Sequence, residues 1–79
     1  MTLDEAKTKI MDKICRDRGT SLQWSREDLQ QTLGIPPALF SQAIGELVAR
    51  QFYLEFNVTH VRLSDAGEAL CDAQPKATA

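Results

Sequence analysis

The sequence predicts a small α+β domain that is mostly helical, and three observations lead to that prediction. Apolar residues recur at spacings of three and four in several segments, as expected for helices with one buried face. Between residues 52 and 63 the period changes to two, which predicts two short strands. The chain has 79 residues, enough for one small core. We therefore expect a single domain over residues 1–74 and a flexible tail over residues 75–79.

Residues 3–18 predict the first helix. Its apolar face consists of Leu3, Ala6, Ile10, Met11, Ile14 and Cys15. Gly19 is expected to end it, with Arg16 and Arg18 in the last turn, where cations suit the helix dipole. A short extended piece over residues 20–24 follows, and Trp24 is expected to anchor the core.

Residues 25–51 predict two helices joined by a tight turn. Ser25 suits the N-cap of the first, with Asp28 three residues later. Gly34 stands where a left-handed residue ends a helix, and a Pro-Pro pair at 36–37 can open the next. The buried face of the second helix, over residues 36–51, is expected to consist of Phe40, Ala43, Ile44 and Leu47.

A hairpin and a last helix complete the expected order. Phe52, Leu54 and Phe56 alternate along one strand, and Val61 and Leu63 along the next, with a turn near residues 57–59. Ser64 and Asp65 can cap a helix over residues 65–73. Its apolar side is expected to consist of Ala66, Ala69, Leu70 and Ala73.

Composition restricts the classes of function. The formal charge is −2 and the pI about 5.2, which lowers the expected affinity for phosphate backbones. No segment approaches the roughly 20 apolar residues of a membrane span, and the N-terminal MTLDEAKTKI is not a secretory signal. We therefore expect a cytoplasmic protein with no membrane contact.

The cysteines predict no metal site. Cys15 and Cys71, with the single histidine His60, cannot supply four zinc ligands. Because cytosolic disulfides are rare, we expect two reduced, half-buried thiols. A redox switch or an intersubunit disulfide is the alternative. The sequence also has no glycine-rich phosphate loop and no nucleophile–base set, so we expect neither a cofactor nor an enzyme.

Two segments resemble the winged helix-turn-helix superfamily, particularly the small bacterial transcriptional regulators. Residues 29–53, LQQTLGIPPALFSQAIGELVARQFY, look like the turn and recognition helix of that family, in which "LGI" precedes a small or Pro-rich helix start. Residues 61–70, VRLSDAGEAL, are similar to its strand-to-helix exit "v-x-L-T-x-x-G-x-x-L". The resemblance covers about residues 20–70. It implies a three-helix core, a small antiparallel hairpin as the wing, and a C-terminal helix.

The resemblance implies binding of double-stranded DNA and control of transcription. Helix 36–51 would lie in the major groove, and the turn at 56–61 would be the wing. The groove-facing positions carried over from the family are Pro37, Ala38, Ser41, Gln42, Gly45 and Glu46. Gln42 could bond adenine, Ser41 could reach a phosphate or base edge, and Arg50, His60 and Arg62 could meet phosphates. A homodimer through helices 3–18 and 65–73 would double these contacts.

The chain departs from the family in its charge, which keeps a second function open. Family members often carry Lys or Arg where Gln42, Gly45 and Glu46 stand, and charges cancel between Pro36 and Arg62. A winged-helix module that binds a protein partner is therefore the alternative, with the small residues of helix 36–51 as its surface. A positive patch joining Lys9, Lys13, Arg50 and Arg62 would favour DNA, whereas scattered charge would favour a protein.

Overall fold

The computed structural model describes residues 1–21, 23–56 and 59–73, and over them the fold is α+β and mostly helical, as predicted. The elements are, in chain order, α1 (Leu3–Asp17), β1 (Trp24–Ser25), α2 (Arg26–Leu33), α3 (Pro37–Ala49), β2 (Leu54–Phe56), β3 (His60–Leu63) and α4 (Asp65–Ala73). Within these ranges, no helix combines the length and the apolar character that crossing a bilayer requires.

Local capping fixes the starts and ends of the helices. Before α1, the Thr2 side chain accepts a hydrogen bond from the Glu5 amide at 3.1 Å, and the Glu5 carboxylate accepts one from the Thr2 amide at 2.8 Å. The predicted caps of the next pair are confirmed, because Ser25 Oγ accepts from the Asp28 amide and Gly34 has a φ of +66°. Pro37 is the first residue of α3, as expected.

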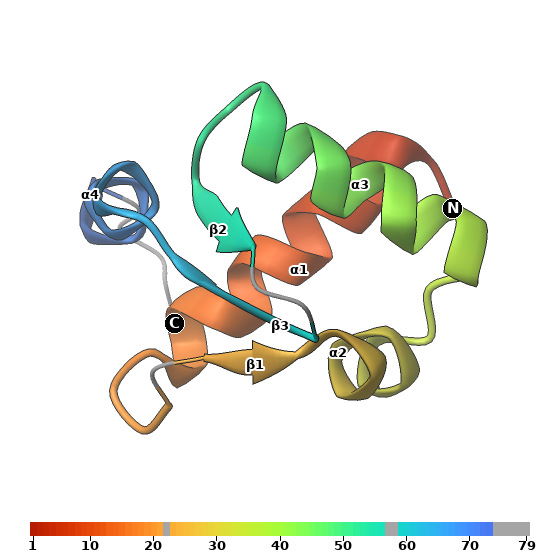
Figure 1. Cartoon of the computed structure of the whole chain (residues 1–79), viewed down its shortest axis with the longest axis horizontal. Coiled ribbons are helices and arrows are strands. Elements are labelled where there is room, and N and C mark those ends of the chain that lie inside the picture. The colour runs from red at the N-terminus through yellow and green to blue at the C-terminus, as the bar shows by residue number, and fades with distance from the viewer. Residues whose placement is uncertain (22, 57–58, 74–79) are drawn as a thin grey trace.

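The three strands form one antiparallel sheet in the order β1-β3-β2. Trp24 pairs with Val61, and Glu55 pairs with Arg62. Since β3 lies between the other two, the hairpin is joined through β1 to the start of α2. Figure 1 shows α3 above α1, α2 at the lower right, α4 at the left edge, and β3 running from the side of α4 toward α2.

The core lies between α1, α3 and the sheet, with Leu29 and Ile35 closing it from the α2 side. Its buried side chains are Ala6, Ile10, Met11, Ile14, Trp24, Leu29, Ile35, Phe40, Ala43, Ile44, Leu47, Leu54 and Val61. Trp24 is 8% exposed, which confirms the prediction that it anchors the core. The predicted inward faces of the first and third helices are therefore confirmed.

The segment after α3 differs from the prediction. The helix ends at Ala49 instead of residue 51, and Phe52 is 65% exposed with a φ of +59°. The Tyr53 amide donates to the Leu47 carbonyl at 2.9 Å, and Ser64 Oγ donates to the Phe52 carbonyl. These bonds turn the chain sharply before β2 begins at Leu54. The prediction that Phe52 faces the core as the first residue of a strand is wrong.

The buried face of α4 also differs from the prediction. Gly67 and Cys71 are buried and Leu70 is half-buried, whereas the alanines at 66, 69 and 73 are exposed. The cause is a close approach that only glycine permits, because a Cβ on Gly67 would overlap the carbonyl oxygen of Tyr53. The predicted cap is confirmed, since Ser64 Oγ accepts from the Gly67 amide at 3.1 Å.

The expectation of two free thiols is wrong. Cys15 and Cys71 form a disulfide that joins α1 to α4, with 5.4 Å between their Cα atoms. The packing of α1 and α4, which brings these two residues together, could not be read from residue spacing. The expected tail at 75–79, residues 57–58 of the expected turn and Leu22 lie outside the described residues.

Candidate nucleic-acid interface

The outward face of α3 carries five of the predicted site residues together. Those five, all exposed, are Pro37, Ala38, Ser41, Gln42 and Gly45. Residues separated by three or four positions lie on the same side of a helix, so these side chains form one continuous strip. Directly beneath it, Phe40, Ile44 and Leu47 are each at most 3% exposed. The strip therefore lies on a helix fixed firmly by the core.

Glu46 does not belong to this strip, contrary to the expectation that it faces the groove. It is half-buried and turns toward α1, where its carboxylate lies 3.7 Å from Lys7 Nζ. The same carboxylate lies 3.6 Å from Arg50 Nη1. Its negative charge is therefore shared between two cations at the edge of α3. This removes part of the repulsion that a groove-facing carboxylate would impose on phosphates.

A cleft opens beside the first turn of α3, with a volume of about 340 Å³. Its lining consists of Ser25, Arg26, Glu27, Gln30, Pro37, Phe40, Ser41 and Thr59. The Arg26 amide donates to the Thr59 carbonyl at 3.0 Å, which joins the first turn of α2 to the end of the hairpin. The cleft thus places the Ser41 hydroxyl among other hydroxyls, an amide, a guanidinium and a carboxylate.

Arg26 and Thr59 were missed as candidates by the sequence reasoning. The Ser25 cap indicates that Arg26 lies in a first helical turn. Their proximity depends on the register of β1 on β3, in which Ser25 pairs with His60. No local pattern in the sequence encodes that register.

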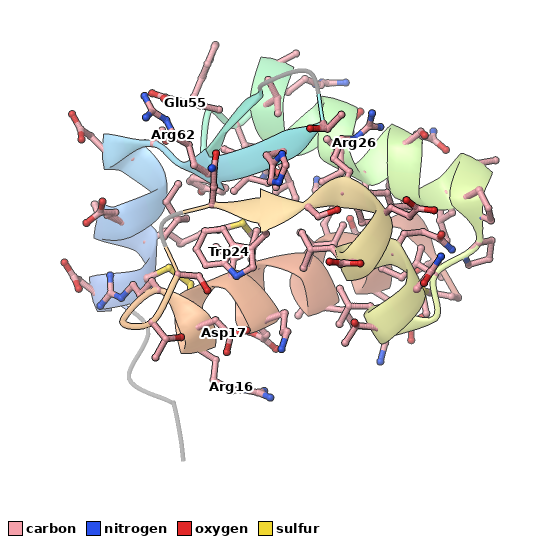
Figure 2. All side chains as sticks on the ribbon, turned by 60° about the horizontal axis from the view of Figure 1, so that its bottom comes forward. Arg16, Asp17, Trp24, Arg26, Glu55 and Arg62 are labelled. Carbon is pink, nitrogen blue, oxygen red and sulfur yellow. A yellow bond between two sulfur atoms is a disulfide. The ribbon has the colours of Figure 1, made fainter. Side chains whose placement is uncertain are left out.

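The two predicted residues of β3 lie on the outer side of the sheet. Residues alternate across a strand, so His60 and Arg62 face away from the buried Val61. Figure 2 shows Arg62 and Glu55 beside each other on this face, with 2.8 Å between Arg62 Nε and Glu55 Oε1. His60 Nδ1 is hydrogen-bonded to Thr59 Oγ1 at 2.7 Å.

Arg50 stands apart from the α3 strip. It is the C-cap of a helix of 13 residues, so at about 1.5 Å per residue it lies roughly 20 Å from Pro37. The structure therefore brings together the five residues of α3 and leaves Arg50 at the far end. The two residues of β3 lie on the sheet.

Positive charge is dispersed over the surface. Of the four cations expected to form a patch, Lys13 pairs with Asp17 at 2.8 Å, Arg50 with Glu46 and Arg62 with Glu55. Lys9 is exposed on α1. These cations stand on three different elements, and three of them have a carboxylate neighbour. By the criterion stated above, this scattered charge counts against strong DNA binding and is the arrangement expected of a surface that binds a protein.

Comparison of the chain with protein-family models, with curated proteins and with solved structures finds no match.

Proposed function

We propose that the chain is a winged helix-turn-helix domain that binds duplex DNA through α3 and regulates transcription in the cytoplasm. The order α1–β1–α2–α3–β2–β3–α4 supports the fold, since it agrees with the order of elements expected from the resemblance. The observation that carries the proposal is the α3 strip, in which Ser41 and Gln42 are exposed above a buried face. A helix presented in this way suits insertion into a major groove.

The ion pairs set the expected strength of binding. Surface pairs of this kind contribute about 0–1 kcal/mol each, so a phosphate can replace the carboxylate beside Arg62 or Arg50. Each exchange leaves a carboxylate close to the DNA, which opposes binding. We therefore expect weak binding that depends strongly on salt. A homodimer through residues 3–18 and 65–73 would double the contacts.

Fluorescence anisotropy with a labelled duplex at about 50 mM salt tests the backbone contacts, because phosphate binding is strong at low salt. Glu55→Gln should tighten binding and Arg62→Gln should weaken it, with the salt slope smaller by about 1 in the second variant. Gln23→Ala, which removes an exposed amide in the segment before β1, is the matched control and should change neither. Failure of the wild-type chain to bind any duplex under these conditions would refute the proposal.

Selection from a pool of random duplexes tests the reading of bases. The wild-type chain should enrich a sequence, and the double variant Ser41→Ala/Gln42→Ala should lose that preference while keeping non-specific affinity. Each lost bidentate base contact should cost about 1–3 kcal/mol of discrimination. Equal enrichment by the wild type and the double variant would remove these two residues from the reading surface.

A protein-binding module is the second candidate, favoured by the balanced charge of this surface. Ala38, Gly45 and Ala49 are exposed, so a partner backbone can approach α3 closely. A protein held in this way should remain bound after Arg62→Gln and be lost after Gly45→Leu, which places a bulky side chain on the strip. DNA binding should respond to both changes, so the pair of variants separates the two candidates.

A further inference from the structure

The disulfide joins the last turns of two helices that are far apart in sequence. Cys15 lies two residues before the end of α1 and Cys71 two residues before the end of α4. Cys71 is 8% exposed, whereas Cys15 is half-buried. A thiolate from solvent therefore has its best approach to the sulfur of Cys15.

Besides the disulfide, α4 is held by Leu70, which packs half-buried against the core, and by a small set of further contacts. Arg18 Nη2 lies 2.5 Å from Asp72 Oδ1, and Arg18 Nη1 donates to the Glu68 carbonyl at 3.3 Å. At the other end, Gly67 packs against Tyr53 and Leu63. The helix has nine residues, and isolated helices shorter than about 12–15 residues are marginal in water. Its helical state therefore depends on these anchors.

Helix α4 covers the edge of the core, where its Leu70 packs half-buried against the apolar cluster and its Cys71 is buried. Among the described residues, the buried apolar cluster draws its members from α1, β1, α2, α3, β2, β3 and the turn at Ile35, and none from α4. The alanines at 66, 69 and 73 face solvent. Loss of α4 would thus uncover the rim of the core at Tyr53 and Leu63 without opening a cavity inside it.

From these observations we propose that the Cys15–Cys71 bond is a redox latch: reduction by a dithiol releases α4 from α1, while the remainder of the domain stays folded. The proposal goes beyond DNA binding and does not depend on it. The oxidation state would decide whether the apolar rim at Tyr53 and Leu63 is covered or exposed.

The reaction is an ordinary thiol–disulfide exchange. A thiolate of the dithiol attacks Cys15 Sγ and forms a mixed disulfide, and the sulfur of Cys71 leaves as a thiolate that takes a proton from water. The second thiol of the reductant then displaces Cys15 and closes the reductant into its own disulfide. Two electrons pass to the protein and the dithiol is oxidised.

Hydrogen exchange followed by mass spectrometry tests the latch on the full chain, with and without dithiothreitol. In the reduced protein, amides of residues 65–73 should exchange at least tenfold faster than in the oxidised protein. Residues 29–47 should remain at least tenfold more protected than residues 65–73. Replacing dithiothreitol with oxidised glutathione should restore the original pattern.

Two outcomes would overturn the latch. Simultaneous loss of protection over residues 29–47 and 65–73 would mean that the bond holds the whole fold. Unchanged protection over residues 65–73 would mean that α4 stays docked without it. Cys71→Ser is the control, expected to match the reduced wild type and to ignore dithiothreitol; if it does not fold, the measurement on reduced wild type still decides. No DNA is present, so the result is separate from the proposed function.

Discussion

Helix α1 contacts α3 on one side and α4 on another, and the two contacts are built differently. Toward α3 it presents a continuous apolar face on which Ala6, Ile10 and Ile14 are fully buried. Toward α4 it presents the Cys15 disulfide and the Arg18 guanidinium. The first contact depends on removing apolar area from water, and the second on a covalent bond and an ion pair.

The α1–α3 contact is stabilised by apolar burial, and the α1–α4 contact mainly by the disulfide. Full burial of an Ile side chain contributes about 1.5–3 kcal/mol, and several such residues act together between α1 and α3. The disulfide closes 56 residues of chain, which the chain-entropy account values at about 4 kcal/mol. The α1–α3 contact should therefore weaken when apolar side chains are truncated. The α1–α4 contact should weaken when the disulfide is reduced or the ion pair is removed.

The largest effect is expected from Ile10→Ala at the α1–α3 contact. Ile10 is fully buried, so truncation should lower the free energy of unfolding by about 2–5 kcal/mol. The loss should appear in urea denaturation as one transition seen alike by all probes. Ile10→Val should cost about 0.5–1.5 kcal/mol. A loss below about 1 kcal/mol for the alanine variant would contradict the view that this face carries the fold.

Gly67→Ala should disturb the packing of α4 against Tyr53 and Leu63, at a cost of about 1–3 kcal/mol, the usual cost of overpacking. The added Cβ would overlap the Tyr53 carbonyl, so α4 should move away and its amides should exchange faster while α3 stays protected. Gly45→Ala is the matched control, because nothing lies within 4 Å of a Cβ there. That variant should gain about 0.5–1 kcal/mol. Equal effects of the two variants would remove the special role of Gly67.

Arg18→Gln should have a smaller effect, about 1 kcal/mol, on the contact between α1 and α4, because Asp72 is exposed and Arg18 is partly exposed. The difference from wild type should shrink in high salt, which screens surface charges. Thermal denaturation at low and high salt measures it. Arg16→Gln, an exposed arginine in the same turn of α1, serves as control. Persistence of the full difference in high salt would indicate a role beyond charge.

The smallest effect is expected at the opposite end of α1. The pKa of Glu5 is lowered, first by the hydrogen bond from the Thr2 amide. A carboxyl whose folded pKa is depressed contributes stability that is fully present above its unfolded pKa, and loses it as pH falls through the folded value. Carboxyl-detected NMR should therefore show the pKa of Glu5 below the ordinary value of a glutamate, and Thr2→Ala should raise it toward that value. A Glu5 pKa at the ordinary value in the wild type would contradict this cap.

The same contrast explains which parts of the molecule could be predicted. The α1–α3 face follows from apolar spacing, and the α2–α3 turn from Ser25, Gly34 and the prolines, since these signals are local. The exposed strip of α3 can also be predicted, because it is the side of the helix opposite the predicted buried face. The partner of Cys15, the burial of Gly67 and the outward turn of Phe52 depend on contacts between distant segments. The pairing of Glu46 with Lys7 likewise requires α1 and α3 to be packed first.

Ser25 belongs to both a strand and a helix cap, and this couples the sheet to α2. It is the last residue of β1, paired with His60, and also the N-cap of α2. No residue separates strand from helix, and the Arg26–Thr59 hydrogen bond braces the joint from the other side. A displacement of the hairpin would therefore tilt α2 directly. Since α3 follows α2 after a short turn, α3 would move with it.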